Sequence, residues 1–259
     1  MGRINCFIPF ANAAQVSKTV EGLKENDLVN KIYLLANDEA EGSVEGCEVI
    51  KVKNLNSSAT IKAIAEKADA DYVLLYTKYN TLKFAPFAIE RFVKIADDSQ
   101  SSMCYADHYN VTEKGAVKAP VIDYQFGALR DDFDFGSVIL YCGKCFKKAA
   151  EAMKADYEFA GLYDHRLKLS QIGKLTHINE YLYSDVELDT RKSGEKIFDY
   201  VDPKNRGRQI EMEAACTEHL KEIGGYLAPT KVVDGKEVPN FKHIEFNRGE
   251  FDVEATVMI

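Results

Sequence analysis

The sequence has no long apolar run and no export signal. No stretch approaches the roughly 20 apolar residues that a helix needs to span a bilayer. The N-terminal segment MGRINCFIPF lacks the charged region, long apolar region and cleavage site of a secretory leader. Cys6 stands where the N-myristoylation pattern requires Ser or Thr. These absences predict a soluble cytoplasmic protein with no transmembrane segment.

The sequence also has fewer basic than acidic residues. Lys and Arg together number 33, against 41 Asp and Glu, which gives a formal net charge of −8. The basic residues are scattered, with no basic block and no stripe in which basic and aromatic side chains alternate. This distribution argues against nucleic acid or an anionic membrane surface as the main partner.

Several ligand-binding motifs are missing. Neither the dinucleotide fingerprint G-x-G-x-x-G nor the P-loop pattern G-x-x-x-x-G-K-[ST] follows any of the predicted strands. Of the six cysteines, only Cys142 and Cys145 have C-x-x-C spacing, and no second pair completes a zinc site. A redox pair is one interpretation of this spacing. Ordinary buried thiols in a reducing compartment are the interpretation that we favour.

What the sequence does contain is an alternation of apolar strands and amphipathic helices. The apolar run Tyr72–Tyr76 predicts a strand that is buried on both faces, as at the centre of a parallel sheet covered by helices. The N-terminal half predicts further strands at 4–9, 31–36 and 48–52, and helices over 16–26, 58–68 and 84–96. This order predicts an α/β fold with a largely parallel sheet.

Polar residues follow three of these strands. Pro9–Asn12 come after the first strand, Asn37–Asp38 after the second, and Thr77–Asn80 after the strand at 72–76. Ligands of open α/β sheets bind beyond the carboxyl ends of the strands. We therefore expect these three loops to converge on one crevice.

The second half of the chain is richer in aromatic and acidic residues, above all in the segment 123–137 (DYQFGALRDDFDFGS). A helix is predicted over 203–223, with Gly224 and Gly225 at its end, and the tail from Tyr226 is predicted to be a loop. The remaining predicted elements are strands at 103–111, 138–141, 175–178 and 181–183, a hairpin-like turn at 113–115, and helices at 144–153 and from about 161.

Taken in order, these segments resemble the GT-A domain of family-2 glycosyltransferases. PFAN (Pro9–Asn12) is similar to the family's P-x-x-N, AND (Ala36–Asp38) to the acidic end of its second strand, and DYVLLYTKYN to the strand that leads into its D-x-D loop. The motifs that follow in the family's order are YADHYNV (105–111), FGSVILY (135–141), AGLYDHRLKLS (160–170) and HINEYLY (177–183). The resemblance covers about residues 4–183.

The resemblance implies a GT-A-like fold, with a mixed, mainly parallel sheet flanked by helices and a C-terminal helical appendage. It also implies transfer of a sugar from a nucleotide-sugar donor to a glycan or lipid-linked acceptor, as in polysaccharide biosynthesis. In the family, the D-x-D aspartates hold a divalent metal, Mn or Mg, on the donor diphosphate, where a cation stabilises the charge of the leaving group. A carboxylate of an E-D motif deprotonates the acceptor hydroxyl.

Both motifs are altered in this chain. The D-x-D-D positions correspond to Thr77-Lys78-Tyr79-Asn80, so the carboxylates that usually hold the metal are absent. A divalent metal stays an alternative, and Asp107 and His108 are nearby candidates for metal or acceptor contacts. The E-D-Y-D-L positions correspond to GLYDH at 161–165, which keeps only Asp164. Lys78 would replace the metal with a fixed positive charge, or else is a solvated lysine in a site that has lost function.

The candidate catalytic residues are Asp164 and Asp107. Asp164 is either the base or a residue that complements the dipole of its helix. Asp107 and His108 are adjacent on a strand, so only one of them is expected to face the crevice. The candidate donor-binding residues are Pro9, Asn12, Asp38, Thr77, Lys78 and Asn80.

The candidate acceptor-binding residues are Arg130, Asp131 and Asp132, with Tyr124 and Phe126 as stacking surfaces. The alternative is a surface loop held together by its own ion pairs. His177 is interpreted as structural. Four basic residues are candidates for phosphate contacts, although we favour exposed charge for them: Arg191, Lys192, Arg206 and Arg208.

We expect a glycosyltransferase domain over residues 1–200, an amphipathic helical appendage over 201–226, and a linker or tail over 227–259. The run Val253–Ile259 echoes Asn5–Ile8, so one hypothesis makes it the start of a second glycosyltransferase domain in a longer chain; a terminal strand that completes the sheet is the alternative. The alternative function is a catalytically inactive module that binds a nucleotide-sugar or glycan and scaffolds an active glycosyltransferase domain.

Overall fold

The structure, a computed structural model, describes residues 2–187, 206–234 and 242–246. Two compact units are distinguished, Met1–Cys216 and Thr217–Ile259, with the division inside one helix. The domain limits predicted above stay predictions. The residues considered at Arg191, Lys192 and 253–259 lie outside the described ranges.

The first unit is built on one sheet. Its described strands are β1 (Ile4–Asn12), β2 (Val29–Glu41), β3 (Glu48–Lys51), β4 (Tyr72–Tyr76), β5 (Thr81–Phe84), β6 (Met103–Thr112), β7 (Gly115–Ala119), β8 (Val138–Cys142) and β9 (Leu175–Val186). Their order is β3-β2-β1-β4-β8-β6-β9-β5, and β7 pairs with β6. The pairs β1–β2, β1–β4, β2–β3 and β6–β9 are parallel, and the others are antiparallel.

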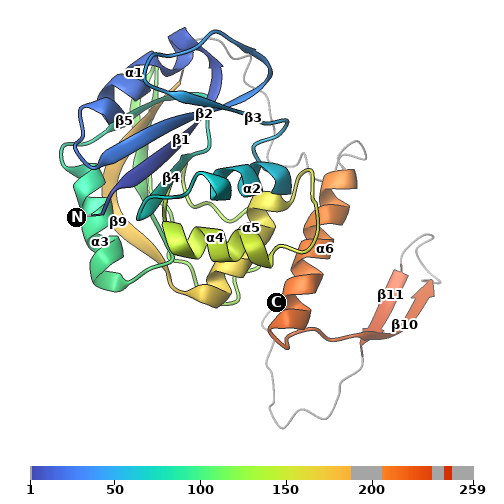
Figure 1. Cartoon of the computed structure of the whole chain (residues 1–259). Coiled ribbons are helices and arrows are strands. Elements are labelled where there is room, and N and C mark those ends of the chain that lie inside the picture. The colour runs from blue at the N-terminus through green and yellow to red at the C-terminus, as the bar shows by residue number, and fades with distance from the viewer. Residues whose placement is uncertain (1, 188–205, 235–241, 247–259) are drawn as a thin grey trace. The chain divides into compact units, whose positions relative to one another are not determined.

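Helices cover both faces of this sheet (Figure 1). They are α1 (Ala13–Lys24), α2 (Ser58–Glu66), α3 (Ala88–Ser99), α4 (Gly143–Ala152) and α5 (Gly161–Ile172). Side chains of α1 and α3 belong to one apolar core, and side chains of α2, α4 and α5 belong to a second core on the opposite face. The predicted α/β architecture, a sheet between two layers of helices, is confirmed.

Strand β4 shows why the sheet is buried on both sides. Tyr72, Leu74 and Tyr76 contribute to the core under α1 and α3. Val73 and Leu75, which alternate with them, contribute to the core under α2 and α4. All five side chains are buried, as the continuous apolar run predicts.

Three helices begin at side chains that accept a backbone hydrogen bond. The Asn12 side chain accepts from the Gln15 N–H, and the Ser57 side chain from the Thr60 N–H, which caps α1 and α2. The Cys142 sulfur accepts from the Cys145 N–H, 3.4 Å away, at the start of α4. Both thiols of the C-x-x-C pair are free, as are the other four cysteines.

The segment after β4 differs from the predicted pattern. Its periodicity predicts a helix from residue 84, but Thr81–Phe84 form β5, antiparallel to β9, and α3 begins only at Ala88. Pro86 disfavours helical backbone at the residue before it. Phe87 then adopts a left-handed conformation with φ of 59°, so the helix cannot extend back through it.

The tail also differs from its prediction as a loop. Helix α6 (Arg206–Glu222) is followed by an antiparallel pair, β10 (Pro229–Asp234) and β11 (Lys242–Phe246). The β-branched residues of PTKVVD favour a strand. In the sequence, Pro229, Gly235 and Pro239 obscure that preference.

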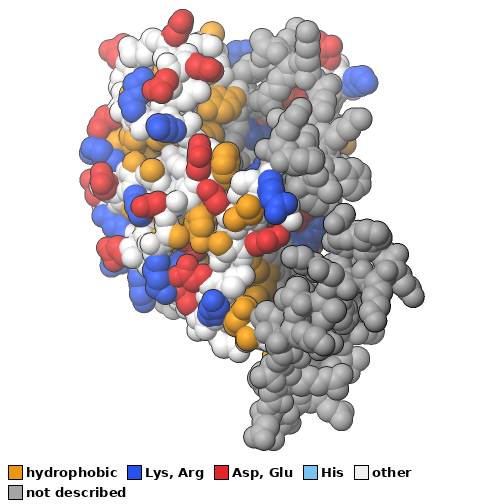
Figure 2. All heavy atoms as spheres, turned by 90° about the vertical axis from the view of Figure 1, so that its right-hand side faces the viewer, with side chains coloured by type: hydrophobic (Ala, Val, Ile, Leu, Met, Phe, Trp, Pro, Cys, Tyr) orange, Lys and Arg blue, Asp and Glu red, His pale blue; other side chains and the backbone are white. Residues whose placement is uncertain are grey.

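In the described part of the chain, no helix is long and apolar enough to cross a membrane. On the face drawn in Figure 2, acidic and basic side chains are interspersed over the described surface. This distribution agrees with the scattered charge of the sequence.

Candidate functional site

A hollow of about 410 Å³ lies where β1 and β2 end, beside the loop that follows β4. We call it the strand-end hollow. The three segments that were expected to converge all reach it, which agrees with the location of ligands in open α/β sheets. It is lined by Ala11, Asn12, Asn37, Glu39, Glu41 and Tyr79.

The strand-end hollow takes alternate residues from β2. The strand continues past its predicted end to Glu41, so successive side chains point to opposite sides. Asn37, Glu39 and Glu41 therefore line the hollow, whereas Asp38 is exposed and lies outside that lining. The sequence predicts Asp38 as a donor-binding residue, whereas the structure places Asn37 and Glu39, its neighbours on β2, in the lining of the hollow.

Gln15 fixes the turn between β1 and α1. Its side chain accepts a hydrogen bond from the Ala11 N–H at 3.1 Å and donates to the Pro9 carbonyl at 3.4 Å. Pro9 is buried. The pairing of β1 with β4 covers only Ile4 to Phe7, so no β4 residue pairs with Pro9, which has no backbone N–H to donate. Asn12 is exposed at the rim of the hollow, where its side-chain amide oxygen, Oδ1, caps α1.

The loop after β4 contains an ion pair. The Lys78 ammonium lies 2.7 Å from a carboxylate oxygen of Asp185, which comes from the end of β9. The Tyr76 hydroxyl donates to the other carboxylate oxygen at 2.5 Å. Burial acts to raise the pKa of Asp185, but the hydrogen bonds from Lys78 and Tyr76 and the lysine charge outweigh it, so the pKa is lowered. Asp185 is thus held as a buried anion.

The other residues of this loop differ in how far they contact the rest of the protein. Thr77 donates to the Ser137 carbonyl from its backbone N–H at 2.9 Å and from its hydroxyl at 3.3 Å. Asn80 is buried. Tyr79 faces the strand-end hollow, and burial together with the negative charge of Glu39 raises the pKa of its hydroxyl. Lys78, with 41% of its side chain exposed, remains accessible from this loop.

Asp107 lies inside the protein. One of its carboxylate oxygens accepts the Val121 N–H at 2.9 Å and lies 2.9 Å from His177 Nε2. The other ring nitrogen of His177 lies 2.7 Å from Asp123. The imidazole therefore ties the segment at 121–123 to β6 and β9, the arrangement expected of a structural histidine.

His108, the neighbour of Asp107, is directed toward the Lys78 side. Its ring stacks on Tyr183 at 5.0 Å between centroids. Burial and the positive charge of Lys78 lower its pKa, so the imidazole is kept neutral. Both members of the Asp107–His108 pair are buried, on opposite sides of their strand.

Asp164 occupies the first turn of α5 and is 0% exposed. A carboxylate oxygen lies 3.8 Å from the ammonium of Lys168, which is one turn further along and also buried. Gly161 marks the first E-D position, and a Cβ there would lie 2.1 Å from the Ser58 backbone nitrogen. Leu162, at the second position, donates its N–H to the Asn56 carbonyl. This end of α5 is packed against the start of α2.

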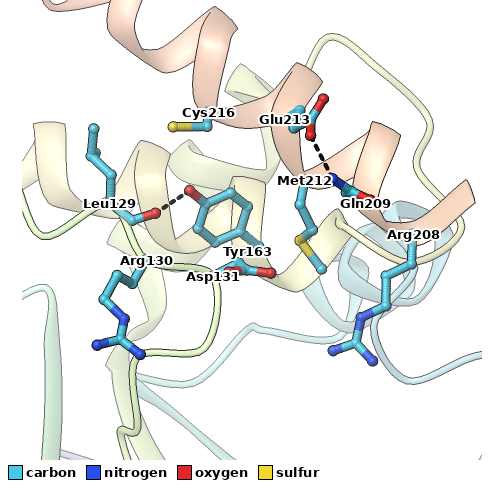
Figure 3. A pocket seen from close by; sticks show the side chains of 9 residues that line it. All are labelled: Leu129, Arg130, Asp131, Tyr163, Arg208, Gln209, Met212, Glu213 and Cys216. Atoms are coloured by element: carbon cyan, nitrogen blue, oxygen red, sulfur yellow. Dashed lines mark hydrogen bonds between the residues drawn. The ribbon is translucent and has the colours of Figure 1, made fainter. Parts of the chain in front are cut away.

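The predicted acceptor residues lie in two environments. Arg130 donates two hydrogen bonds to Asp132, at 2.8 and 2.7 Å, and both side chains are exposed. The guanidinium lowers the pKa of the Asp132 carboxyl. Arg130 also lines a pocket beside Tyr163, together with Asp131 (Figure 3). Among the stacking candidates, Phe126 is 75% exposed.

Sequence reasoning missed Asp185 and Tyr76 as parts of this site. The sequence predicts two short strands that end at Tyr183, whereas β9 runs unbroken to Val186. Asp185 therefore lies beside the loop after β4, although the two are far apart in the sequence. The available signal was an acidic residue within the strand-like run YLYSDV.

The D-x-D position does not fit a divalent cation. Its accessible side chain is the ammonium of Lys78, and the nearby carboxylate of Asp185 is already paired with it. Within the described ranges, no group of three or more His, Cys, Asp or Glu side chains is placed to hold a metal ion. We therefore derive no chemical step through a metal at this position.

Comparison with known proteins shows the fold. Neither a family model nor a curated protein matches the sequence. Among solved structures, S. aureus TarS 1–349 in complex with UDP-GlcNAc is similar with a TM-score of 0.58 and 11% identity, over 84% of this chain and 66%, just under two thirds, of that one. Another structure of TarS 1–349 gives a TM-score of 0.53 and 9% identity, over 95% and 97%. At these identities the similarity shows the fold alone, and this chain has a GT-A-like fold.

Proposed function

We propose that this chain is a glycosyltransferase-type domain that binds a nucleotide-sugar donor in the strand-end hollow. The observation that carries the proposal is the meeting of the β1, β2 and β4 ends at one hollow in a GT-A-like fold. The TarS structure named above holds UDP-GlcNAc. A nucleotide-sugar is therefore the donor class to test first.

The hollow offers suitable groups for the nucleoside. Tyr79 provides an aromatic face for the base. Glu39 and Glu41 provide carboxylates that accept hydrogen bonds from ribose hydroxyls, and Asn12 and Asn37 provide amides. Lys78, next to Tyr79 in the chain, is the cation available to the diphosphate. An ammonium has three N–H donors, so its pairing with Asp185 leaves donors for phosphate oxygens.

In this proposal, the sugar is transferred to a glycan or lipid-linked acceptor. Donor cleavage places negative charge on the leaving diphosphate, and Lys78 would stabilise that charge. The acceptor hydroxyl requires a base. Asp164 is the carboxylate retained from the E-D motif, and it would have to separate from Lys168 and become accessible before it could take a proton.

The second candidate function is binding without transfer, as a module that scaffolds an active glycosyltransferase domain. It is favoured by the burial of both candidate catalytic carboxylates, Asp107 and Asp164. Each faces a positively charged or hydrogen-bonding partner in the interior. A general base must come within hydrogen-bond reach of the proton that it removes.

Calorimetric titration of the whole chain with UDP-GlcNAc and other nucleotide-sugars, with and without Mn²⁺, tests the proposal. We expect binding that does not require Mn²⁺ and that weakens about tenfold in Lys78→Met, a loss of ~1.4 kcal/mol. Lys83→Met is the matched control because Lys83 is an exposed lysine on β5 that, unlike Lys78, is not next to Tyr79 and does not pair with Asp185. If no donor binds, or if binding strictly requires Mn²⁺, the proposed site is wrong.

Turnover separates the two candidate functions. Release of UDP from UDP-GlcNAc, measured with glycan and lipid-linked acceptors present, would support a transferase. Binding of the donor without UDP release under any of these conditions would support the scaffold.

A further inference from the structure

Two adjoining pockets lie away from the strand-end hollow. They are formed by the segment 123–137, by α5 and by the part of α6 up to Cys216, and their volumes are about 270 and 140 Å³. We call them together the arginine pocket. Four residues line both parts: Asp131, Tyr163, Arg208 and Met212.

The inner part of the arginine pocket is lined by a buried guanidinium. Arg166, on α5, is 5% exposed, and it donates to the backbone carbonyls of Ala128 and Arg130 at 2.8 Å each. Its charge lies over the aromatic rings of Tyr163, at 4.9 Å, and Phe135, at 5.7 Å. Within the described ranges, no carboxylate forms an ion pair with it. A buried cation without an anion is costly, so an anion beside Arg166 would be stabilising.

A second guanidinium, that of Arg208, lines both parts of the pocket. In Figure 3, Arg130 and Arg208 extend on the same side of the pocket, with Asp131 and Tyr163 between them. Arg130 is already bound to Asp132 through two hydrogen bonds. Arg208 is exposed and has no ion-pair partner among the described residues. Its planar fork can therefore bind a phosphate or carboxylate group.

We propose that the arginine pocket binds a small anionic ligand about the size of one sugar. Its phosphate or carboxylate group lies between Arg166 and Arg208, and its body packs against Tyr163 and Met212. Asp131 accepts hydrogen bonds from its hydroxyls. The parts, of about 270 and 140 Å³, are each smaller than the roughly 300–1,000 Å³ usual for sites of drug-sized ligands, which suits a ligand of this size. The residues of the strand-end hollow take no part, so the inference does not rest on the proposed function.

The test is calorimetric titration of the whole chain with glucose 1-phosphate, glucuronate, inorganic phosphate and uncharged glucose. We expect the sugar anions to bind and glucose to bind at least tenfold more weakly. Arg208→Ala should weaken the binding of the sugar anions about tenfold. Arg206→Ala is the matched control, because it removes the same charge from the same exposed end of α6, outside the pocket lining. Preference for glucose 1-phosphate or for glucuronate assigns the group that the site takes.

Arg166→Lys provides a second variant, which keeps the buried charge but loses the planar fork. We expect it to weaken binding of the sugar anions while a parallel titration with UDP-GlcNAc is unchanged. Equal binding of glucose and its anionic relatives, or undiminished anion binding in Arg208→Ala, would overturn the inference. Loss of UDP-GlcNAc binding alone bears on the strand-end hollow and leaves the arginine pocket standing.

Discussion

The loop after β4 has no carboxylate of its own, and Asp185 from β9 supplies one. Lys78 and Tyr76 hold it from two sides, and it is fully buried. The loop therefore presents an ammonium that is partly neutralised at its inner end and open to solvent at its outer side. A lysine in this state attracts a diphosphate less strongly than an unpaired one, which is why we expect a tenfold effect rather than a complete loss.

The ion pair makes a prediction for stability. Lys78→Met leaves the buried Asp185 carboxylate with the hydrogen bond from the Tyr76 hydroxyl but without its cation, so we expect a loss of about 1–3 kcal/mol in the free energy of unfolding. The half-exposed position of Lys78 keeps the loss at the lower part of that range. Urea denaturation measures it.

The double variant Lys78→Met/Asp185→Asn removes both charges. We expect it to lose less free energy of unfolding than the two single losses added together, because no unpaired charge is then buried. Additive losses would mean that the two side chains do not interact.

His165 predicts a dependence of stability on pH. It is fully buried, its Nε2 lies 3.1 Å from the Phe146 carbonyl oxygen, and burial lowers its pKa to about 4. The unfolded chain has an ordinary histidine pKa near 6.5 and binds the proton more readily. Stability from this residue is therefore complete above about pH 6.5 and declines by up to about 1.4 kcal/mol per pH unit as the pH falls toward 4.

Urea midpoints at pH 7 and pH 5 check this expectation. In His165→Leu, the part of the pH dependence that comes from this imidazole should disappear. An unchanged difference between the two pH values in that variant would show that other groups cause it.

At the scale of elements, α6 is joined to the start of α5 through one carboxylate. Glu211 accepts the backbone N–H groups of Glu158, Phe159 and Ala160, at 3.1, 2.6 and 3.1 Å. These donors precede the first turn of α5, where an anion also complements the helix dipole. Glu211 thus performs a capping role that α5 lacks in its own sequence.

Glu211→Gln should lower the free energy of unfolding by about 1–2 kcal/mol, because charge-assisted hydrogen bonds to three N–H groups become neutral ones. Glu213→Gln is the control, since Glu213 is exposed and accepts a hydrogen bond from Gln209 on the same helix. Equal urea midpoints for the Glu211 variant and the wild type would contradict the capping role.

The elements predicted from sequence are those with a long periodic signal. The buried run of β4 and the caps Asn12 and Ser57 are local features, and the structure agrees with each. The misplaced start of α3 has a tertiary cause: four residues after the β4 loop pair with β9, which lies some hundred residues away in the chain. No local pattern contains that partner.

At the scale of the whole molecule, the central strands should be the most protected. Strands β1, β4 and β8 lie within the sheet and are almost wholly buried, whereas β7 is exposed. We expect amide hydrogens of β4 and β8 to exchange only through global unfolding, and those of β7 to exchange through local opening. Hydrogen exchange followed by mass spectrometry distinguishes them. Similar protection in β7 and β4 would show that the hairpin opens only with the core.

The candidate site was predictable where it depends on strand order. Three strand ends lead to the hollow, and the sequence shows each end. The ion pair with Asp185 and the burial of Asp107 depend on β9 and on the segment at 121–123. Such pairings between distant segments are not encoded in the spacing of residues along either one.

The close approach at Gly161 bears on whether this position could accept a carboxylate side chain. A side chain at this position would meet the backbone of Ser57 and Ser58, at 2.4 and 2.1 Å from its Cβ, and backbone cannot turn aside as a flexible side chain can. A glutamate introduced there would first have to push α2 away from α5. Gly161→Glu alone would damage the fold before it supplied a base, so a single substitution at this position cannot introduce a usable carboxylate.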